Sequence, residues 1–241
     1  MPKVAKWIGD AVEGLMKTKF PMMKVVDKVY ITPNFIKVKF YGDIANMDFQ
    51  PGYAVAIRVN DTEFRNYTPY FFNKEKGSLE IIFHMHGSAS GTEFIRSLEI
   101  GHHLRISIPR GKKMYDSSAS TYIFFGDETS LGLAYALQAV VKQEHQSIQF
   151  YFELDKENIY LPELLGIKRN YVFENKESFT DEELISDILF KNSLHTEMDN
   201  KCFVLTGNAK SVQTIRNVLK RENVKGRIIA QAYWAEGKQG L

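Results

Sequence analysis

The pattern of hydrophobic residues changes once along this chain, and that change limits the folds open to it. Up to about Pro109, short runs of β-branched and aromatic residues alternate with turn residues, which is typical of strands. Beyond about Ser120, strand-like runs alternate with segments of helical periodicity. The first pattern predicts a small antiparallel β-barrel, and the second predicts a doubly wound parallel sheet with helices. We therefore expect a fold of the β plus α/β class.

A polar segment without periodicity, residues 111–120, separates the two patterns. We take it as the boundary between a barrel domain over residues 21–115 and an α/β domain over residues 120–241. Apolar residues recur at helical spacing within residues 1–20, with Lys and Asp between them, which predicts an N-terminal amphipathic helix. A chain of 241 residues is long enough for two compact domains.

The same patterns predict the individual elements. In the first domain, strands are expected at residues 24–26, 35–40, 53–59, 79–83 and 104–108, with one helix at 92–98. In the second domain, strands are expected at 121–125, 147–154, 170–174, 201–205 and 227–233, with helices at 129–143, 181–190 and 209–221. The pattern Thr180-x-x-Glu183 predicts a capping box at the start of the helix at 181–190.

Composition limits the cellular compartments and the classes of partner that we expect for this protein. The net charge is +2, which gives no reason to expect a nucleic acid or an acidic membrane as partner. A single cysteine, Cys202, excludes an internal disulfide and agrees with a reducing compartment. No stretch approaches the length of a membrane span. We expect a cytoplasmic protein, as a monomer or a homodimer.

The motif Arg65-Asn66-Tyr67-Thr68 is the first candidate for a binding site. A guanidinium can pair with a phosphate, a phenol ring can pack on a flavin, and a hydroxyl can reach a ring nitrogen. Arg65 and Tyr67 share one face of a strand, and Thr68 joins them only if the strand bends, which Pro69 favours. Taken alone, the motif more often describes a surface Arg beside a half-buried Tyr, so the following segments decide.

A loop of small residues runs from His86 to Thr92 and leads into the predicted helix. Backbone amides at a helix start, together with the helix dipole, favour a phosphate, and Ser90 or Thr92 can add a hydroxyl. N-capping by Thr92 is a compatible structural interpretation. His84 and His86 lie on one strand face, but no carboxylate or thiol follows at a ligand spacing, so no metal site is assigned.

The second domain has its own candidate segments. Residues 126–129, Gly-Asp-Glu-Thr, lie between a predicted strand and helix, where doubly wound domains bind nucleotides. The two acids would repel a pyrophosphate, and they stabilise a helix start, so capping is a complete structural explanation. Lys210 and Arg216 suit a 2′-phosphate or, equally, form a solvated basic helix face. Tyr233-Trp234 either stacks on a ligand ring or packs a strand end.

In this order, these segments resemble the siderophore-interacting protein family, a branch of the ferredoxin-reductase-like flavoproteins. The resemblance runs from about Val25 to the C-terminus. It implies a cofactor site formed by Arg65, Tyr67, Thr68, His86, Gly87, Ser88, Ser90, Gly91, Thr92, Gly126, Asp127, Glu128, Thr129, Tyr233 and Trp234. Thr68 is the residue expected beside the reacting ring. The chain departs from the family in lacking a Pro in the small-residue loop and in carrying Ala235 where an Arg usually follows Tyr-Trp.

The resemblance implies an FAD-dependent oxidoreductase that passes electrons from NADPH or NADH to an acceptor, with a ferric siderophore as the implied acceptor. FAD is preferred over FMN because the two-part anion site has room for a pyrophosphate. Two alternatives stay open at this point: an FAD electron-transfer module reduced by a ferredoxin-like protein, and a non-catalytic flavin-binding scaffold.

Overall fold

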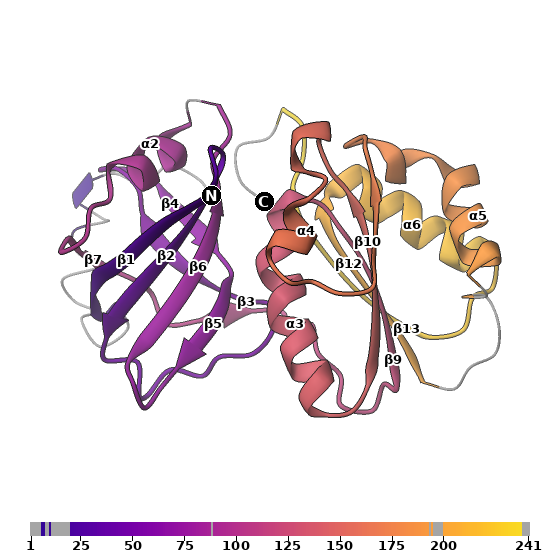
Figure 1. The fold of residues 1–241 in the computed structure, drawn as a ribbon, viewed down its shortest axis with the longest axis horizontal. Coiled ribbons are helices and arrows are strands. Elements are labelled where there is room, and N and C mark those ends of the chain that lie inside the picture. Colours follow the sequence, from indigo (N-terminus) through magenta and orange to yellow (C-terminus); the bar gives the residue numbers. More distant parts are fainter. Residues whose placement is uncertain are drawn as a thin grey trace. The chain divides into compact units, whose positions relative to one another are not determined.

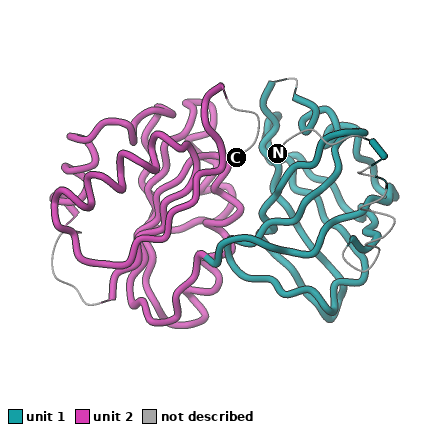
Figure 2. The backbone as a smooth tube through the Cα atoms, turned by 180° about the vertical axis from the view of Figure 1, so that it is seen from behind, with its two compact units in different colours: residues 1–113, 240 teal, residues 114–239, 241 magenta. Residues whose placement is uncertain are grey.

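The computed structural model describes residues 6–7, 10, 20–87, 89–192, 194 and 200–237. The chain forms two compact units, residues 1–113 and residues 114–239 (Figure 2). The division therefore lies inside the polar segment 111–120. Most of the helix predicted over residues 1–20 lies outside the described residues.

Antiparallel strands build the first unit (Figure 1). They are β1 (Met22–Thr32), β2 (Phe35–Gly42), β3 (Tyr53–Arg58), β4 (Phe64–Tyr67), β5 (Pro69–Asn73), β6 (Ser78–His84), β7 (His103–Arg105) and β8 (Arg110–Gly111). One sheet has the order β5-β6-β2-β1-β7, and the other has the order β4-β3-β8. A bridge between Ile57 and Ile106 links the sheets, which gives the small barrel expected from the sequence.

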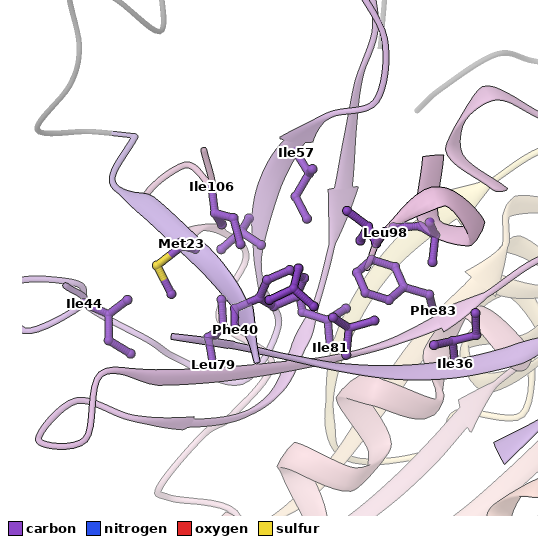
Figure 3. Close-up of a cluster of buried hydrophobic side chains, with 14 of the residues drawn as sticks. Met23, Ile36, Phe40, Ile44, Ile57, Leu79, Ile81, Phe83, Leu98 and Ile106 are labelled. Atoms are coloured by element: carbon purple, nitrogen blue, oxygen red, sulfur yellow. The ribbon is translucent and has the colours of Figure 1, made fainter. Parts of the chain in front are cut away.

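Alternating side chains fill the interior of this barrel. Along β2, Ile36, Val38 and Phe40 are fully buried, while the residues between them are half-buried. Leu79, Ile81 and Phe83 of β6 meet them from the neighbouring strand, as Figure 3 shows for the labelled members of the cluster. Each such side chain stabilises the fold by about 1.5–3 kcal/mol when fully buried.

A single helix interrupts the strands of this unit. It is α2 (Ser90–Ser97), which begins two residues before the predicted start. Ala89 is the N-cap residue and makes no side-chain cap hydrogen bond. Capping by Thr92 is therefore wrong as a structural explanation, because Thr92 lies within the first turn. Its hydroxyl instead donates to the carbonyl oxygen of His86 at 3.1 Å.

Five parallel strands form the sheet of the second unit, in the order β11-β10-β9-β12-β13. They are β9 (Thr121–Gly126), β10 (Ser147–Glu153), β11 (Asn170–Phe173), β12 (Lys201–Asn208) and β13 (Arg227–Trp234). The helices are α3 (Leu131–Gln143), α4 (Leu161–Leu164), α5 (Glu182–Lys191) and α6 (Ala209–Arg221), with 3₁₀ turns η2 (Glu128–Ser130), η3 (Lys156–Asn158) and η4 (Ser178–Thr180). This is the predicted doubly wound domain.

Strand β9 is central, and its two neighbours determine where a ligand is expected. After β9 the chain adds β10 and β11 on one side, then returns to add β12 and β13 on the other side. The order of strands therefore reverses between β9 and β12. In sheets of this kind, ligands bind beyond the carboxyl ends of the strands at such a reversal.

The start of α5 differs from the sequence prediction. Asp181 is the N-cap residue, and its carboxylate accepts hydrogen bonds from the amides of Glu183 and Leu184 at 2.9 and 3.2 Å. The Thr180 hydroxyl donates instead to the carbonyl of Glu177 at 2.8 Å. The capping box at Thr180 is thus wrong, because an aspartate one residue later reaches the same amides with a charged acceptor. Among the described helices, none is long and apolar enough to cross a membrane.

Candidate functional site

Strand β4 positions Arg65 and Tyr67 on one face, as their spacing predicts. They pair with Ile57 and Val55 of β3. The ring of Tyr67 packs edge-on against Phe83, with centroids 4.7 Å apart. Burial raises the pKa of the Tyr67 hydroxyl to about 12, although the Arg65 guanidinium opposes the shift. Tyr67 is therefore a neutral phenol at physiological pH.

Thr68 lies at the point where the chain changes sheets. β4 belongs to the sheet β4-β3-β8, whereas β5, which begins at Pro69, belongs to the five-stranded sheet. Thr68 stands between the two strands and is half-buried. The bend expected from Pro69 is therefore present, and it frees Thr68 from the strict alternation that would point it away from Arg65 and Tyr67.

The N-terminus of α2 meets β4 at Gly91. A Cβ atom at Gly91 would lie 2.9 Å from the Tyr67 hydroxyl and 3.6 Å from Cγ of Arg65. Only a residue without a side chain permits this approach, which brings the first turn of α2 against the side chains of Tyr67 and Arg65. A guanidinium beside helix-start amides fits the phosphate of a nucleotide cofactor. Ser88 lies outside the described residues.

The remaining loop residues shape the approach to α2. Gly87 has a φ of +60°. His86 is exposed, and its carbonyl holds the hydroxyl of Thr92. The His86 ring lies 5.2 Å from that of His84, which itself stacks on Phe35 at 4.5 Å. In the described part of the chain, His, Cys, Asp and Glu side chains do not gather in groups of three or more that could hold a metal.

Glu63 is a residue of this site that the sequence motifs did not indicate. Its Oε2 atom accepts hydrogen bonds from Arg65 Nη2 at 3.3 Å, from Asn60 Nδ2 at 3.0 Å and from the Ser90 hydroxyl. Ser90, predicted to face a phosphate, thus binds a carboxylate in this structure. The available signal was spacing, because Glu63 precedes Arg65 by two residues and so can share its face.

In the second unit, Asp127 is a structural acceptor at the end of β9. Its carboxylate accepts from the amide of Thr129 at 2.8 Å and from the indole N–H of Trp234 at 2.7 Å. The Thr129 hydroxyl also donates to it. Burial raises the pKa of Asp127, and the bonds from Thr129 and Trp234 oppose that shift. The predicted capping role is confirmed, and it extends across the sheet to β13.

Glu128 and Glu153 are buried beside Asp127. Oε1 of Glu128 accepts from the amide of Asp155 at 2.7 Å and from the side chain of Asn158 at 3.0 Å. Oε2 of Glu153 accepts from the amide of Phe179 at 2.8 Å. Burial raises the pKa of Glu128 and raises that of Glu153 to about 8. These carboxylates hold the loops that follow the strands.

Gly207 lies near the end of β12, where the order of strands reverses between β9 and β12. Its φ is +102°, and a Cβ atom there would lie 2.5 Å from Oδ2 of Asp127. The neighbouring Thr206 hydroxyl donates to the Ser130 hydroxyl at 2.9 Å, which ties β12 to the turn after β9. Gly126 is equally confined, because its Cβ would lie 2.6 Å from that of Ser130. The backbone of Gly126 and Gly207 therefore lines the carboxyl ends of β9 and β12, and we call this region the floor between β9 and β12.

The other residues predicted for a site in the second unit do not gather at one place. Lys210 and Arg216 are both exposed on α6. They are six residues apart, which corresponds to a rotation of about 240° around the helix axis, so they do not share a face. Asn208 caps α6 by accepting from the Lys210 amide at 2.9 Å. Tyr233 is half-buried on β13, next to Trp234.

Comparison with known proteins agrees with this geometry. Residues 22–115 match the family model of the oxidoreductase FAD-binding domain. No curated protein sequence matches the chain.

Several solved structures share the fold of both units. The siderophore-interacting protein SipS from Aeromonas hydrophila has a TM-score of 0.73 at 20% identity, over 92% of this chain and 93% of that one. Phthalate dioxygenase reductase has a TM-score of 0.72 at 14% identity, over 92% of this chain and 70% of that one. CYP116B46 from Tepidiphilus thermophilus has a TM-score of 0.71 at 15% identity and covers 90% of this chain, which spans only 29% of that protein.

These likenesses confirm the fold that the sequence resemblance implied. The chain combines an FAD-binding domain of the oxidoreductase type with a parallel-sheet domain, in the ferredoxin-reductase-like fold that siderophore-interacting proteins share.

Proposed function

We propose that this protein is an NAD(P)H-dependent flavoprotein reductase that passes electrons through FAD to an acceptor, with a ferric siderophore as that acceptor. The observation that carries the proposal is the convergence of Arg65, Tyr67 and the N-terminus of α2 at Gly91. It occurs within residues 22–115, which match the oxidoreductase FAD-binding domain.

The residues of the first unit have distinct roles in this proposal. Arg65 pairs with a phosphate, and the first-turn amides of α2 provide the second part of an anion site, which favours FAD over FMN. Neutral Tyr67 packs against the flavin, with Gly91 leaving room for its hydroxyl. Thr68 donates a hydrogen bond to a ring nitrogen. When bound, FAD supplies the ability to accept a pair of electrons and release them singly.

We assign the nicotinamide nucleotide to the floor between β9 and β12. Asp127 and Glu128 are buried and accept hydrogen bonds from protein donors, so the nucleotide is expected to contact the backbone near Gly126, Thr129 and Gly207 instead. Phthalate dioxygenase reductase, which shares this fold, takes its electrons from pyridine nucleotides, and this supports such a donor here.

The likeness to SipS supports a ferric siderophore as the acceptor. In the second candidate, the chain exchanges electrons with a protein. Phthalate dioxygenase reductase supports such an exchange, since that enzyme passes its electrons to a [2Fe-2S] centre. Here the electrons would run in the reverse direction, with a ferredoxin-like partner as the donor. A scaffold that binds flavin without turnover is the third candidate, and Ala235, in place of the Arg usual in the family, keeps it open.

An anaerobic absorbance titration tests these candidates. The protein is reconstituted with FAD, titrated with NADPH or NADH, and then mixed with a ferric siderophore. Bleaching by the nucleotide followed by reoxidation on adding the siderophore is the expected result. Bleaching only by a reduced ferredoxin would favour the protein-donor module, and a bound flavin that no donor reduces would favour the scaffold. Failure to take up FAD would refute the flavin assignment itself.

A further inference from the structure

Glu63 accepts hydrogen bonds from Arg65, which the proposed function pairs with a phosphate, and from the hydroxyl of Ser90 at the start of α2. We propose that Glu63 is an internal anion that holds Arg65 and Ser90 in place until the flavin phosphate displaces it, so that this side chain sets the affinity of the protein for phosphorylated flavins. The inference rests on the proposed flavin site and adds to it a residue that opposes cofactor loading.

A single oxygen atom of Glu63 accepts three hydrogen bonds. Oε2 of Glu63 receives Arg65 Nη2 at 3.3 Å, Asn60 Nδ2 at 3.0 Å and the Ser90 hydroxyl. One donor comes from β4, one from α2, and one from the turn between β3 and β4. Donors converging in this way on one anionic oxygen are the pattern that binds a phosphate oxygen.

The Glu63 carboxylate and a phosphate compete for the same donors at this position. The Glu63 side chain is 10% exposed, and a carboxylate buried to that degree needs charged or hydrogen-bonding partners, which Arg65, Asn60 and Ser90 supply. A phosphate bound by Arg65 Nη2 and the Ser90 hydroxyl would take these two donors away from Glu63 and lie against a second negative charge. Glu63 must therefore leave before a phosphate can use both donors.

The local backbone allows that movement. Glu63 lies outside β4, in the turn over residues 59–63. The backbone of this turn is fixed by the Val59 amide bonded to the Glu63 carbonyl at 2.9 Å, and by the Thr62 amide bonded to the Asn60 side chain at 2.9 Å. Rotation of the Glu63 side chain breaks neither of these bonds. The donors on β4 and α2 thus stay in place while their acceptor is exchanged.

The test is Glu63→Gln in the full chain, measured by quenching of flavin fluorescence with FAD, FMN and riboflavin. The substitution keeps the size of the side chain and removes its charge. We expect the dissociation constants for FAD and FMN to fall by about tenfold, because Arg65 loses a competing charge-assisted partner. The dissociation constant for riboflavin is expected to stay unchanged, because riboflavin has no phosphate.

Glu80→Gln is the matched control. Glu80 is another carboxylate of the first unit, half-buried where Glu63 is buried, but it binds the Tyr70 hydroxyl and lies 3.5 Å from Lys39. This variant is expected to bind all three flavins like the original protein, and a gain equal to that of Glu63→Gln would overturn the inference.

The remaining outcomes separate the inference from the proposed function. If Glu63→Gln weakens FAD binding or leaves it unchanged, Glu63 only braces Arg65, and the inference fails while the flavin site stands. If riboflavin gains as much as FAD, the effect does not involve a phosphate, and the inference again fails alone. If neither protein binds any flavin, the proposed function fails and the inference fails with it.

Discussion

Both units place a buried carboxylate where a phosphorylated ligand is expected, but the two carboxylates bind different kinds of donors. In the first unit, Glu63 pairs with the guanidinium of Arg65 and with hydroxyl and amide side chains. In the second unit, Asp127 binds a backbone amide, a hydroxyl and the indole of Trp234. Among the described bonds of Asp127, none involves a cationic side chain.

The difference indicates two different roles for an acid at a binding site. The partners of Glu63 can serve a phosphate equally well, so the carboxylate can be exchanged. The partners of Asp127 fix the turn after β9 and the end of β13, so removing that carboxylate would disrupt the fold around it. A carboxylate near an expected phosphate therefore has to be judged by its donors rather than by its charge alone.

The largest expected effect concerns the floor of the second site, at Gly207. Substitution Gly207→Ala places a methyl group 2.5 Å from Oδ2 of Asp127 and requires an L-residue at a φ of +102°. We expect the free energy of unfolding to fall by about 3 kcal/mol or more, measured by urea denaturation. Gly166→Ala is the control, because its φ is +72° with no atom within 4 Å, and it should cost only about 1 kcal/mol. Equal losses would show that Asp127 can move aside.

The next largest effect is the loss of FAD affinity expected when Arg65 is replaced. Arg65→Ala should weaken FAD binding by roughly 30- to 100-fold, or about 2–3 kcal/mol, because a charge-assisted bond to phosphate is lost. Riboflavin binding should be unaffected. A thermal melt without flavin checks that the variant is folded, since Glu63 loses a cationic partner.

Combining Arg65→Ala with Glu63→Gln completes a double-mutant cycle. If Glu63 acts by competing for Arg65, most of the affinity gained by Glu63→Gln should disappear when Arg65 is absent. An undiminished gain would mean that Glu63 repels the phosphate without competing for this guanidinium.

An effect that is smaller per pH unit follows from the buried acid beside Asp127. Burial raises the pKa of Glu153 to about 8 in the folded protein, from an ordinary value of 4.5. Between these values the folded chain holds a proton that the unfolded chain has released, so the unfolding free energy falls as pH rises. The slope is at most about 1.4 kcal/mol per pH unit. Glu153→Gln should flatten this dependence between about pH 4.5 and pH 8, whereas Glu163→Gln, at an exposed position, should keep it.

The sequence predicted well those elements whose signal is periodic. The helix at 209–221 coincides with α6, because its apolar residues repeat on one face and Asn208 caps it. The start of α2 lies two residues before its predicted position, since Ser90 and Gly91 carry no apolar signal. Gly91 contacts β4, and Ser90 binds Glu63. The strand predicted to end at Leu205 continues as β12 to Asn208, because pairing with β13 extends it.

The sites were less predictable because they depend on contacts between distant segments. Arg65 and Tyr67 could be found from their spacing along one strand. The bond between Ser90 and Glu63 spans 27 residues, and the bond between Trp234 and Asp127 spans 107 residues. No local pattern encodes either bond. The sequence therefore showed which residues carry useful chemistry but not which of them already bind one another.

The smallest expected effect separates the two roles considered for Trp234. Trp234→Phe keeps an aromatic ring on β13 but removes the indole N–H that donates to Asp127 at 2.7 Å. We expect the free energy of unfolding to fall by about 1 kcal/mol. The loss should grow as pH rises, because the missing donor stabilises the ionised carboxylate and its removal raises the pKa of Asp127 further. Trp7→Phe, at an exposed position, is the control. A change in FAD affinity without a change in stability would instead assign Trp234 to the flavin. The Asp127 carboxylate would then contribute less to the stability of the fold than its donors indicate.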